Sequence, residues 1–101
     1  MRTYRELIQD TMRDPQEATE YLRVSLDEYE QDGNLEAFLL ALRSVVDAQC
    51  GMTEFAQKTS LNRQSLYKTL SKQGNPRLQT LHTILHALGL KLSIEPMRSS
   101  R

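Results

Sequence analysis

The chain of 101 residues, 39% of them apolar, is long enough to bury one core and too short for two independent cores. Its net charge of zero conceals a division: residues 1–50 hold five basic and eleven acidic side chains (−6), and residues 51–101 hold eight basic and two acidic ones (+6). The single cysteine, Cys50, excludes an internal disulfide framework and a repeated metal-ligand spacing, so we expect a buried or inert thiol.

The division of charge between the two halves indicates which kinds of partner each half could bind. The basic half favours attraction to phosphate groups, whereas the acidic half fits either plain solvation or a basic partner. The longest apolar run, residues 37–42, is far shorter than a membrane span, and no basic-then-apolar leader opens the chain. We therefore expect a cytoplasmic protein that folds as a single domain over residues 1–101.

Residues 1–50 carry start signals for three acidic helices. Thr3 begins a capping-box sequence that opens a first helix, and Asp14 followed by Pro15 opens a second that ends near Gly33. Asn34 caps a third helix, whose apolar residues keep the 3.6-residue period of a buried face: Leu35, Phe38, Leu39, Leu42, Val45 and Val46. This third helix is predicted to be the centre of the core.

Two short helices follow Gly51, within a region over residues 51–89 that we predict to bind DNA. The first covers residues 53–59 and is joined by a tight turn at Ser60 to the second, over residues 62–72. Two short helices joined in this way are typical of the helix-turn-helix. Many such turns have Gly where this chain has Ser60, so we expect either strained backbone there or a slightly different turn.

The second of these helices has the residue types that bind bases in the major groove, where Arg or Lys binds guanine and Gln binds adenine. Its inward side holds Leu66, Thr69 and Leu70, and its outer face has no acidic residue. The alternative is an ordinary helical hairpin whose polar face is merely solvated. The DNA contacts predicted from this helix are Asn62, Arg63, Gln64, Tyr67, Lys68 and Ser71.

A loop over residues 73–77 leads into a last helix, which is closed by Gly89. Asn75 and Arg77 in the loop are predicted to contact phosphates beside the groove. His82 and His86 stand four apart on the last helix, a spacing that can hold zinc, but no third ligand is evident. We expect partly buried packing histidines and no bound metal or cofactor.

After Gly89, apolar residues recur at every second position, which makes residues 90–96 the one strand candidate in the chain. A lone strand leaves its backbone unpaired, so we predict an antiparallel pairing with a second copy and thus a homodimer. Centring the twofold axis on Ser93 sets apolar against apolar and Lys91 against Glu95. Residues 97–101 are predicted to be a disordered tail. The predicted dimerisation residues are Leu90, Lys91, Leu92, Ser93, Ile94 and Glu95.

The chain resembles the addiction-module antidote family, that is, HigA-like antitoxins with a lambda-repressor/Cro-type helix-turn-helix. The resemblance spans roughly residues 14–95, and it departs from the family pattern at Ser60, in place of the common Gly, and at Arg77, in place of a Ser or Thr helix cap. Its most specific part is the series Asn62-Arg63, Leu66-Tyr67, Leu70-Ser71 and Gly74-Asn75-Pro76.

The resemblance implies a dimeric repressor that binds its own promoter and also binds a small basic ribonuclease-type toxin of the RelE/HigB kind. It implies DNA contacts from Arg63, Gln64, Tyr67 and Lys68, with Asn75 and Arg77 on the backbone. The fold class expected is all-α, with five to six helices, a lambda-repressor-like helix-turn-helix and one short C-terminal β-strand.

Other functions stay open at this point. The first is a stand-alone repressor without a toxin, and the second is an interaction adaptor whose helix-turn-helix no longer meets DNA. No enzyme is expected, because the sequence suggests neither a Ser/His/Asp nor a Cys/His arrangement and contains no Gly-rich phosphate loop.

Overall fold

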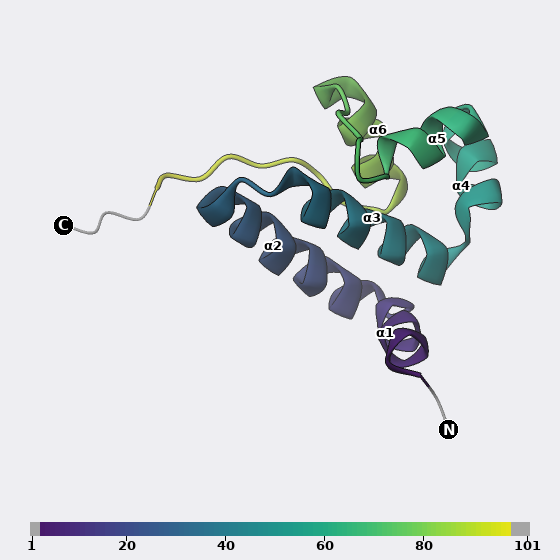
Figure 1. Ribbon diagram of the computed structural model, residues 1–101, viewed down its shortest axis with the longest axis horizontal. Coiled ribbons are helices and arrows are strands. Elements are labelled where there is room, and N and C mark those ends of the chain that lie inside the picture. Colours follow the sequence, from purple (N-terminus) through teal and green to yellow (C-terminus); the bar gives the residue numbers. More distant parts are fainter. Residues whose placement is uncertain (1–2, 98–101) are drawn as a thin grey trace.

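The computed structural model describes residues 3–97, apart from the side chain of Arg5. Helix α3 lies between the α1–α2 pair and the group formed by α4, α5 and α6 (Figure 1). Of the predicted disordered tail, residues 97–101, all residues except Met97 lie outside the described part of the chain. The helices are α1 (Tyr4–Met12), α2 (Pro15–Asp32), α3 (Leu35–Gln49), α4 (Met52–Thr59), α5 (Arg63–Thr69) and α6 (Leu78–Ala87).

The first two helices begin at the caps that the sequence predicts. Thr3 Oγ1 accepts a hydrogen bond from the N–H of Glu6 at 3.1 Å, and the Glu6 carboxylate accepts one from the N–H of Thr3 at 2.7 Å. These two bonds complete the capping box. The hydrogen bond from the backbone N–H of Thr3, followed by the contact with the Thr3 side chain, lowers the pKa of the Glu6 carboxyl group. Asp14 caps α2 by accepting from the N–H of Gln16 at 3.0 Å, and α2 ends at Gly33 in the left-handed conformation.

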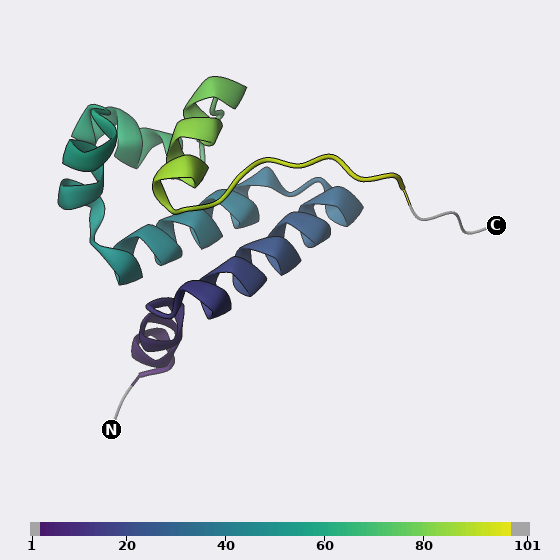
Figure 2. The same ribbon diagram turned by 180° about the vertical axis from the view of Figure 1, so that it is seen from behind.

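Helix α3 is the centre of the core, as predicted. Asn34 caps it by accepting from the N–H of Ala37 at 3.2 Å, and α2 packs along it while α1 and α4 contact it as well (Figure 2). None of the helices in residues 3–97 is both long and apolar enough to cross a membrane. The buried residues of α3 are Phe38, Leu39, Ala41, Leu42, Val45 and Val46.

The predicted C-terminal strand is wrong. Residues 90–97 leave α6 as an extended segment that no other described segment pairs with, so no β-ladder forms (Figure 2). The first residue, Leu90, is half-buried against the core, whereas residues 91–97 are exposed and Ile94 is 99% exposed. The alternating pattern therefore produces extended backbone over these residues but no strand, because no other described segment of the chain supplies ladder hydrogen bonds to it.

Candidate nucleic-acid interface

Helix α5 is held in place by a cap at its N-terminus and by an apolar edge that is buried in the core. The Asn62 side chain accepts hydrogen bonds from two backbone N–H groups, those of Gln64 at 2.9 Å and Ser65 at 3.1 Å. Leu66 is 1% exposed and Leu70, just after the helix, is fully buried. This burial fixes the rotation of α5 so that Arg63, Gln64, Ser65 and Lys68 lie exposed on its other side.

The turn between α4 and α5 is tight because it uses two cross-turn hydrogen bonds. The N–H of Ser60 donates to the carbonyl of Gln57 at 3.3 Å, and the N–H of Leu61 donates to that of Ala56 at 3.1 Å. This geometry requires positive φ at Ser60, where φ is 61°. Of the two alternatives expected at Ser60, the structure shows the strained backbone. An open hollow lies beside the turn, lined by Thr53, Ala56, Gln57, Ser60, Leu61, Asn62 and Arg63.

We expect Ser60→Gly to raise the free energy of unfolding by about 1 kcal/mol, because glycine adopts the left-handed conformation without a Cβ penalty. Thermal unfolding measures the change. Ser65→Gly is the matched control: Ser65 lies within α5, so this change should instead lower the free energy of unfolding, by about 0.5 kcal/mol, through the lower helix propensity of glycine. A Ser60→Gly protein that unfolds below the parent temperature would contradict this reading of the turn.

Helix α5 ends earlier than predicted, at Thr69 rather than near Lys72. The loop turns back at once, so that the backbone of Gly74 passes the Thr69 carbonyl. The hydroxyl of Ser71 donates to the carbonyl of Lys68 at 2.7 Å and accepts from the N–H of Gln73 at 3.3 Å. Ser71, predicted to contact DNA, is therefore half-buried and engaged in closing the helix end.

The loop after α5 places the other two predicted residues at the surface. Asn75 and Arg77 are both exposed, on the chain that leads from α5 to α6. Arg77 precedes α6 without a side-chain cap bond, as expected from the replacement of the usual Ser or Thr. Leu78, the first residue of α6, is 71% exposed, so this corner of the molecule presents both charge and apolar surface.

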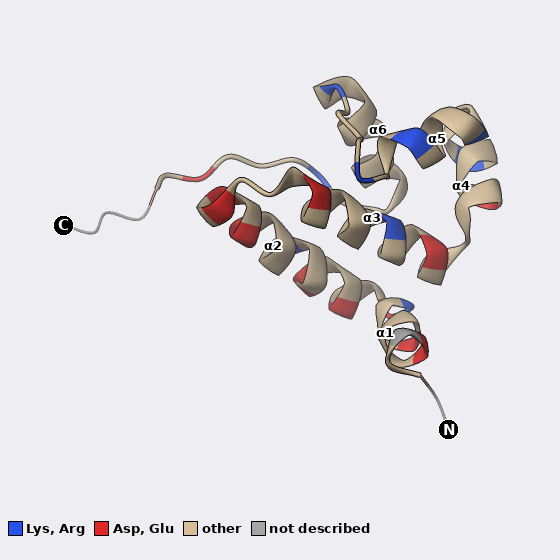
Figure 3. Cartoon of the chain, in the orientation of Figure 1, with Lys and Arg blue, Asp and Glu red and all other residues tan. Residues whose placement is uncertain are grey.

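The two signs of charge are separated in space as well as in sequence. Acidic residues are distributed along α2, whereas basic residues lie on α4, α5 and the loop to α6 (Figure 3). The ion pairs recorded between described residues all lie in the first three helices or, for Arg13, at the cap that ends α1. Among residues 51–89, by contrast, the exposed cations have no carboxylate partner in the described structure; they are Lys58, Arg63, Lys68, Lys72 and Arg77.

Tyr67 lies half-buried against the core and contacts two arginines. The guanidinium carbon of Arg63 is 5.6 Å from the centroid of its ring, and that of Arg43 in α3 is 4.9 Å away. Sequence reasoning did not assign a role to Arg43, because it belongs to the acidic half and lies 24 positions before Tyr67. A helical-face pattern carries no signal for such a contact between two helices.

The histidines and the cysteine have no site around them. His82 and His86 stack with ring centroids 5.1 Å apart, and both are exposed, so the predicted partial burial is wrong. The described residues contain no group of three His, Cys, Asp or Glu side chains placed to hold a metal ion. Burial, with a smaller contribution from Glu54, raises the pKa of the half-buried Cys50 thiol and keeps it protonated at neutral pH.

Comparison with known proteins gives a match over almost the whole chain. A family model described as "Probable addiction module antidote protein" matches residues 5–96. An uncharacterised protein of Haemophilus influenzae is 33% identical over 79 residues, which cover 78% of this chain and 80% of that protein. No solved structure matches the chain.

Proposed function

We infer the function from family membership: this chain belongs to the family of probable addiction module antidote proteins. We propose that it is the HigA-like antitoxin of a type II toxin–antitoxin module, which represses its own promoter and neutralises a toxin of the RelE/HigB kind. Helices α4 and α5 are then the helix-turn-helix of a lambda-repressor/Cro-type domain, and α5 enters the major groove.

The observation that carries DNA binding is the exposed and unpaired positive charge on and around α5. An exposed cation that has no carboxylate partner is free to neutralise a phosphate, and each neutralised phosphate releases condensed counterions. Arg63 and Gln64 lie in the first turn of α5, where side chains point most directly to base edges. Asn75 and Arg77 lie on the adjoining loop, where they support backbone contacts that fix the register.

We also propose a homodimer through the C-terminal segment, because a twofold operator requires two copies of α5. The extended segment carries an apolar residue, Ile94, that is 99% exposed, and a second, Leu92, that is 38% exposed. Antiparallel contact between two copies about Ser93 covers both residues and sets Lys91 beside Glu95 of the other copy.

We expect Ser93→Cys, made in a Cys50→Ser background, to form a covalent dimer readily under mild oxidation. Non-reducing electrophoresis measures the product. Lys91→Cys in the same background is the matched control and should stay largely uncrosslinked, because position 91 lies two positions from the axis and the two thiols are therefore held apart. Efficient crosslinking through position 91 in place of 93 would exclude this arrangement.

The toxin contact is proposed on α2, whose acidic residues are exposed and occur along the length of the helix (Figure 3). A basic toxin is attracted to this surface over a distance of about 8 to 10 Å, the screening length at physiological salt. We expect Asp27→Lys, Glu28→Lys and Glu30→Lys to slow association with the toxin at low salt. Glu54→Lys in α4 is the control, because it changes the net charge equally at another site.

Stopped-flow mixing measures these rates. Equal slowing by Glu54→Lys, or no slowing by the three α2 variants, would contradict the assignment of the contact to α2. The whole function is tested by co-expression with the product of the adjacent gene. Rescue of growth and copurification are expected; a toxic neighbour that this chain neither binds nor neutralises would contradict the antitoxin function.

A further inference from the structure

Arg43 links the acidic half of the molecule to the basic helix α5. It belongs to α3, and its guanidinium group lies over the ring of Tyr67, 4.9 Å from the centroid. Arg63 of α5 approaches the same ring at 5.6 Å. Both distances lie within the range of about 6 Å at which a guanidinium group is attracted to an aromatic face.

The charge of Arg43 is only partly balanced. Its Nε lies 3.7 Å from a carboxylate oxygen of Asp47, a separation too long for a hydrogen bond. The Arg43 side chain is 38% exposed, so its charged end still reaches solvent. Tyr67 is anchored because it packs against the core, and it therefore holds the two arginines in a fixed relation.

We propose that Arg43 is a further DNA-contacting residue, which binds a backbone phosphate beside the groove that α5 enters. Through Tyr67, this phosphate contact fixes the position of Arg63 relative to the DNA. Phosphate contacts set the register of a protein on the duplex, and base contacts then read the sequence. The inference rests on the proposed function, since it requires that α5 binds DNA.

The first expected result concerns affinity and salt dependence together. Arg43→Gln should weaken binding to an unrelated duplex about tenfold at low salt, and binding to the chain's own upstream DNA by more, because Arg63 also loses its fixed position. The slope of log K against log salt should become less steep by about 0.9, the value for one lost phosphate contact. Asp47→Asn removes the competing carboxylate, so it should strengthen binding to both duplexes about threefold.

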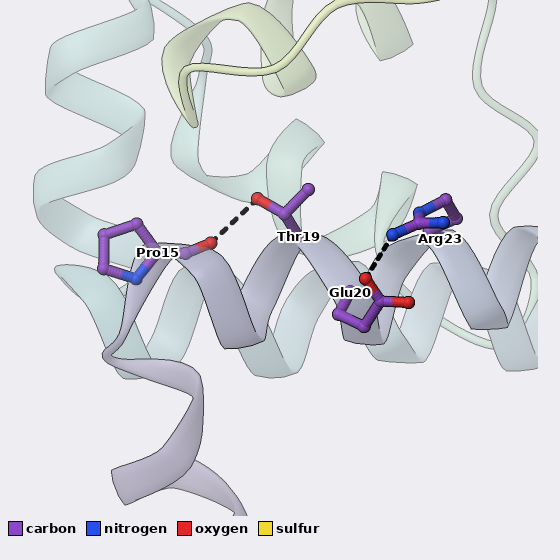
Figure 4. Close-up of polar contacts among 4 residues, drawn as sticks. All are labelled: Pro15, Thr19, Glu20 and Arg23. Carbon is purple, nitrogen blue, oxygen red and sulfur yellow. Dashed lines mark hydrogen bonds and ion pairs between the residues drawn. The ribbon is translucent and has the colours of Figure 1, made fainter.

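Matched controls lie on α2, away from α5. Arg23 is also an arginine paired with a carboxylate three or four positions away, that of Glu20 (Figure 4). The same close-up shows Thr19, whose hydroxyl donates to the carbonyl of Pro15 at 2.8 Å. The polar side chains drawn in this turn of α2 therefore bond within the helix itself. Arg23→Gln and Glu20→Gln repeat the two charge changes on this pair, and we expect both to leave the slope and the affinities close to the parent values.

A purely structural role for Arg43 gives a different outcome. If Arg43 only packs α3 against α5, Arg43→Gln lowers the unfolding temperature while its slope equals that of Arg23→Gln. Arg43→Lys keeps the charge but not the planar stacking group, so we expect it to retain the parent slope and to lose part of the preference for upstream DNA.

Fluorescence anisotropy titrations of the full chain at several salt concentrations decide between these outcomes. Equal slopes for Arg43→Gln and Arg23→Gln, together with unchanged binding by Asp47→Asn, would overturn the role of Arg43 and leave the proposed function standing. A parent protein that binds neither duplex would overturn the proposed DNA binding and this inference with it.

Discussion

Replacing Arg63 or Gln64 by Ala is expected to weaken binding to the operator by about 1 to 3 kcal/mol each, and to change binding to random DNA little. Both side chains are exposed in the first turn of α5, and a bidentate contact to a base edge is worth this amount of discrimination. Competitive anisotropy titrations of the two duplexes measure both free energies.

Lys68→Ala is the comparison variant for this test. Lys68 is exposed in the last turn of α5, where a phosphate contact is expected. Its loss should weaken operator and random DNA evenly and lower the salt slope by about 0.9. If the Arg63, Gln64 and Lys68 variants all bind the operator like the parent, α5 is not the recognition helix.

Gly74→Ala is expected to lower the free energy of unfolding by about 1 to 3 kcal/mol, the usual range for an overpacked site. A Cβ at position 74 would lie 2.0 Å from the carbonyl oxygen of Thr69 and 2.9 Å from the Cδ1 atom of Leu39. The backbone at the end of α5 cannot move aside as a flexible side chain does, so the loop and α5 must shift against α3.

Urea unfolding measures the change for Gly74→Ala. Gln73→Ala is the control, because Gln73 is exposed in the same loop and its backbone bond to Ser71 survives the substitution. We also expect Gly74→Ala to weaken operator binding, since the loop that carries Asn75 and Arg77 moves with it. A Gly74→Ala protein as stable as the Gln73→Ala control would show that the loop does not pass α5 so closely.

The helix starts could be predicted because they depend on neighbouring residues. Thr3, Asp14, Asn34 and Asn62 each accept a hydrogen bond from an N–H two or three positions ahead, so a window of four residues contains the whole signal. The buried stripe of α3 was equally readable, because its period extends over about three turns. Ser60 was also readable as a strained residue, since the tight turn itself requires positive φ.

The features that were missed depend on contacts between distant segments. The early end of α5 follows from the passage of Gly74 beside Thr69, which no helical period encodes. The strand over residues 90–96 was assigned from alternation alone, yet a strand exists only where a second segment supplies hydrogen bonds. The contact between Arg43 and Tyr67 likewise requires the packing of α3 against the helix pair that contains α5.

The burial of the two histidines was predicted wrongly, because a helical wheel does not locate the centre of the apolar face of α6 accurately enough. Helix α6 buries Ile84 and Leu85, and this places His82 and His86 on the exposed side rather than at the edge of the core. One residue advances a helix by 100°, so a small error in the centre of the apolar face moves a neighbouring side chain from partial burial to solvent. The family match and the distribution of charge do not depend on this detail.

The most direct measurement of the central claim is the affinity of the purified chain for the DNA upstream of its own gene. Anisotropy titrations between about 50 and 200 mM salt should give tighter binding to this duplex than to a shuffled one of equal length. Log K should fall linearly with log salt for both duplexes, with a slope set by several phosphate contacts. Equal, salt-independent or undetectable binding to the two duplexes would contradict the proposal that this antidote-family protein is a DNA-binding antitoxin.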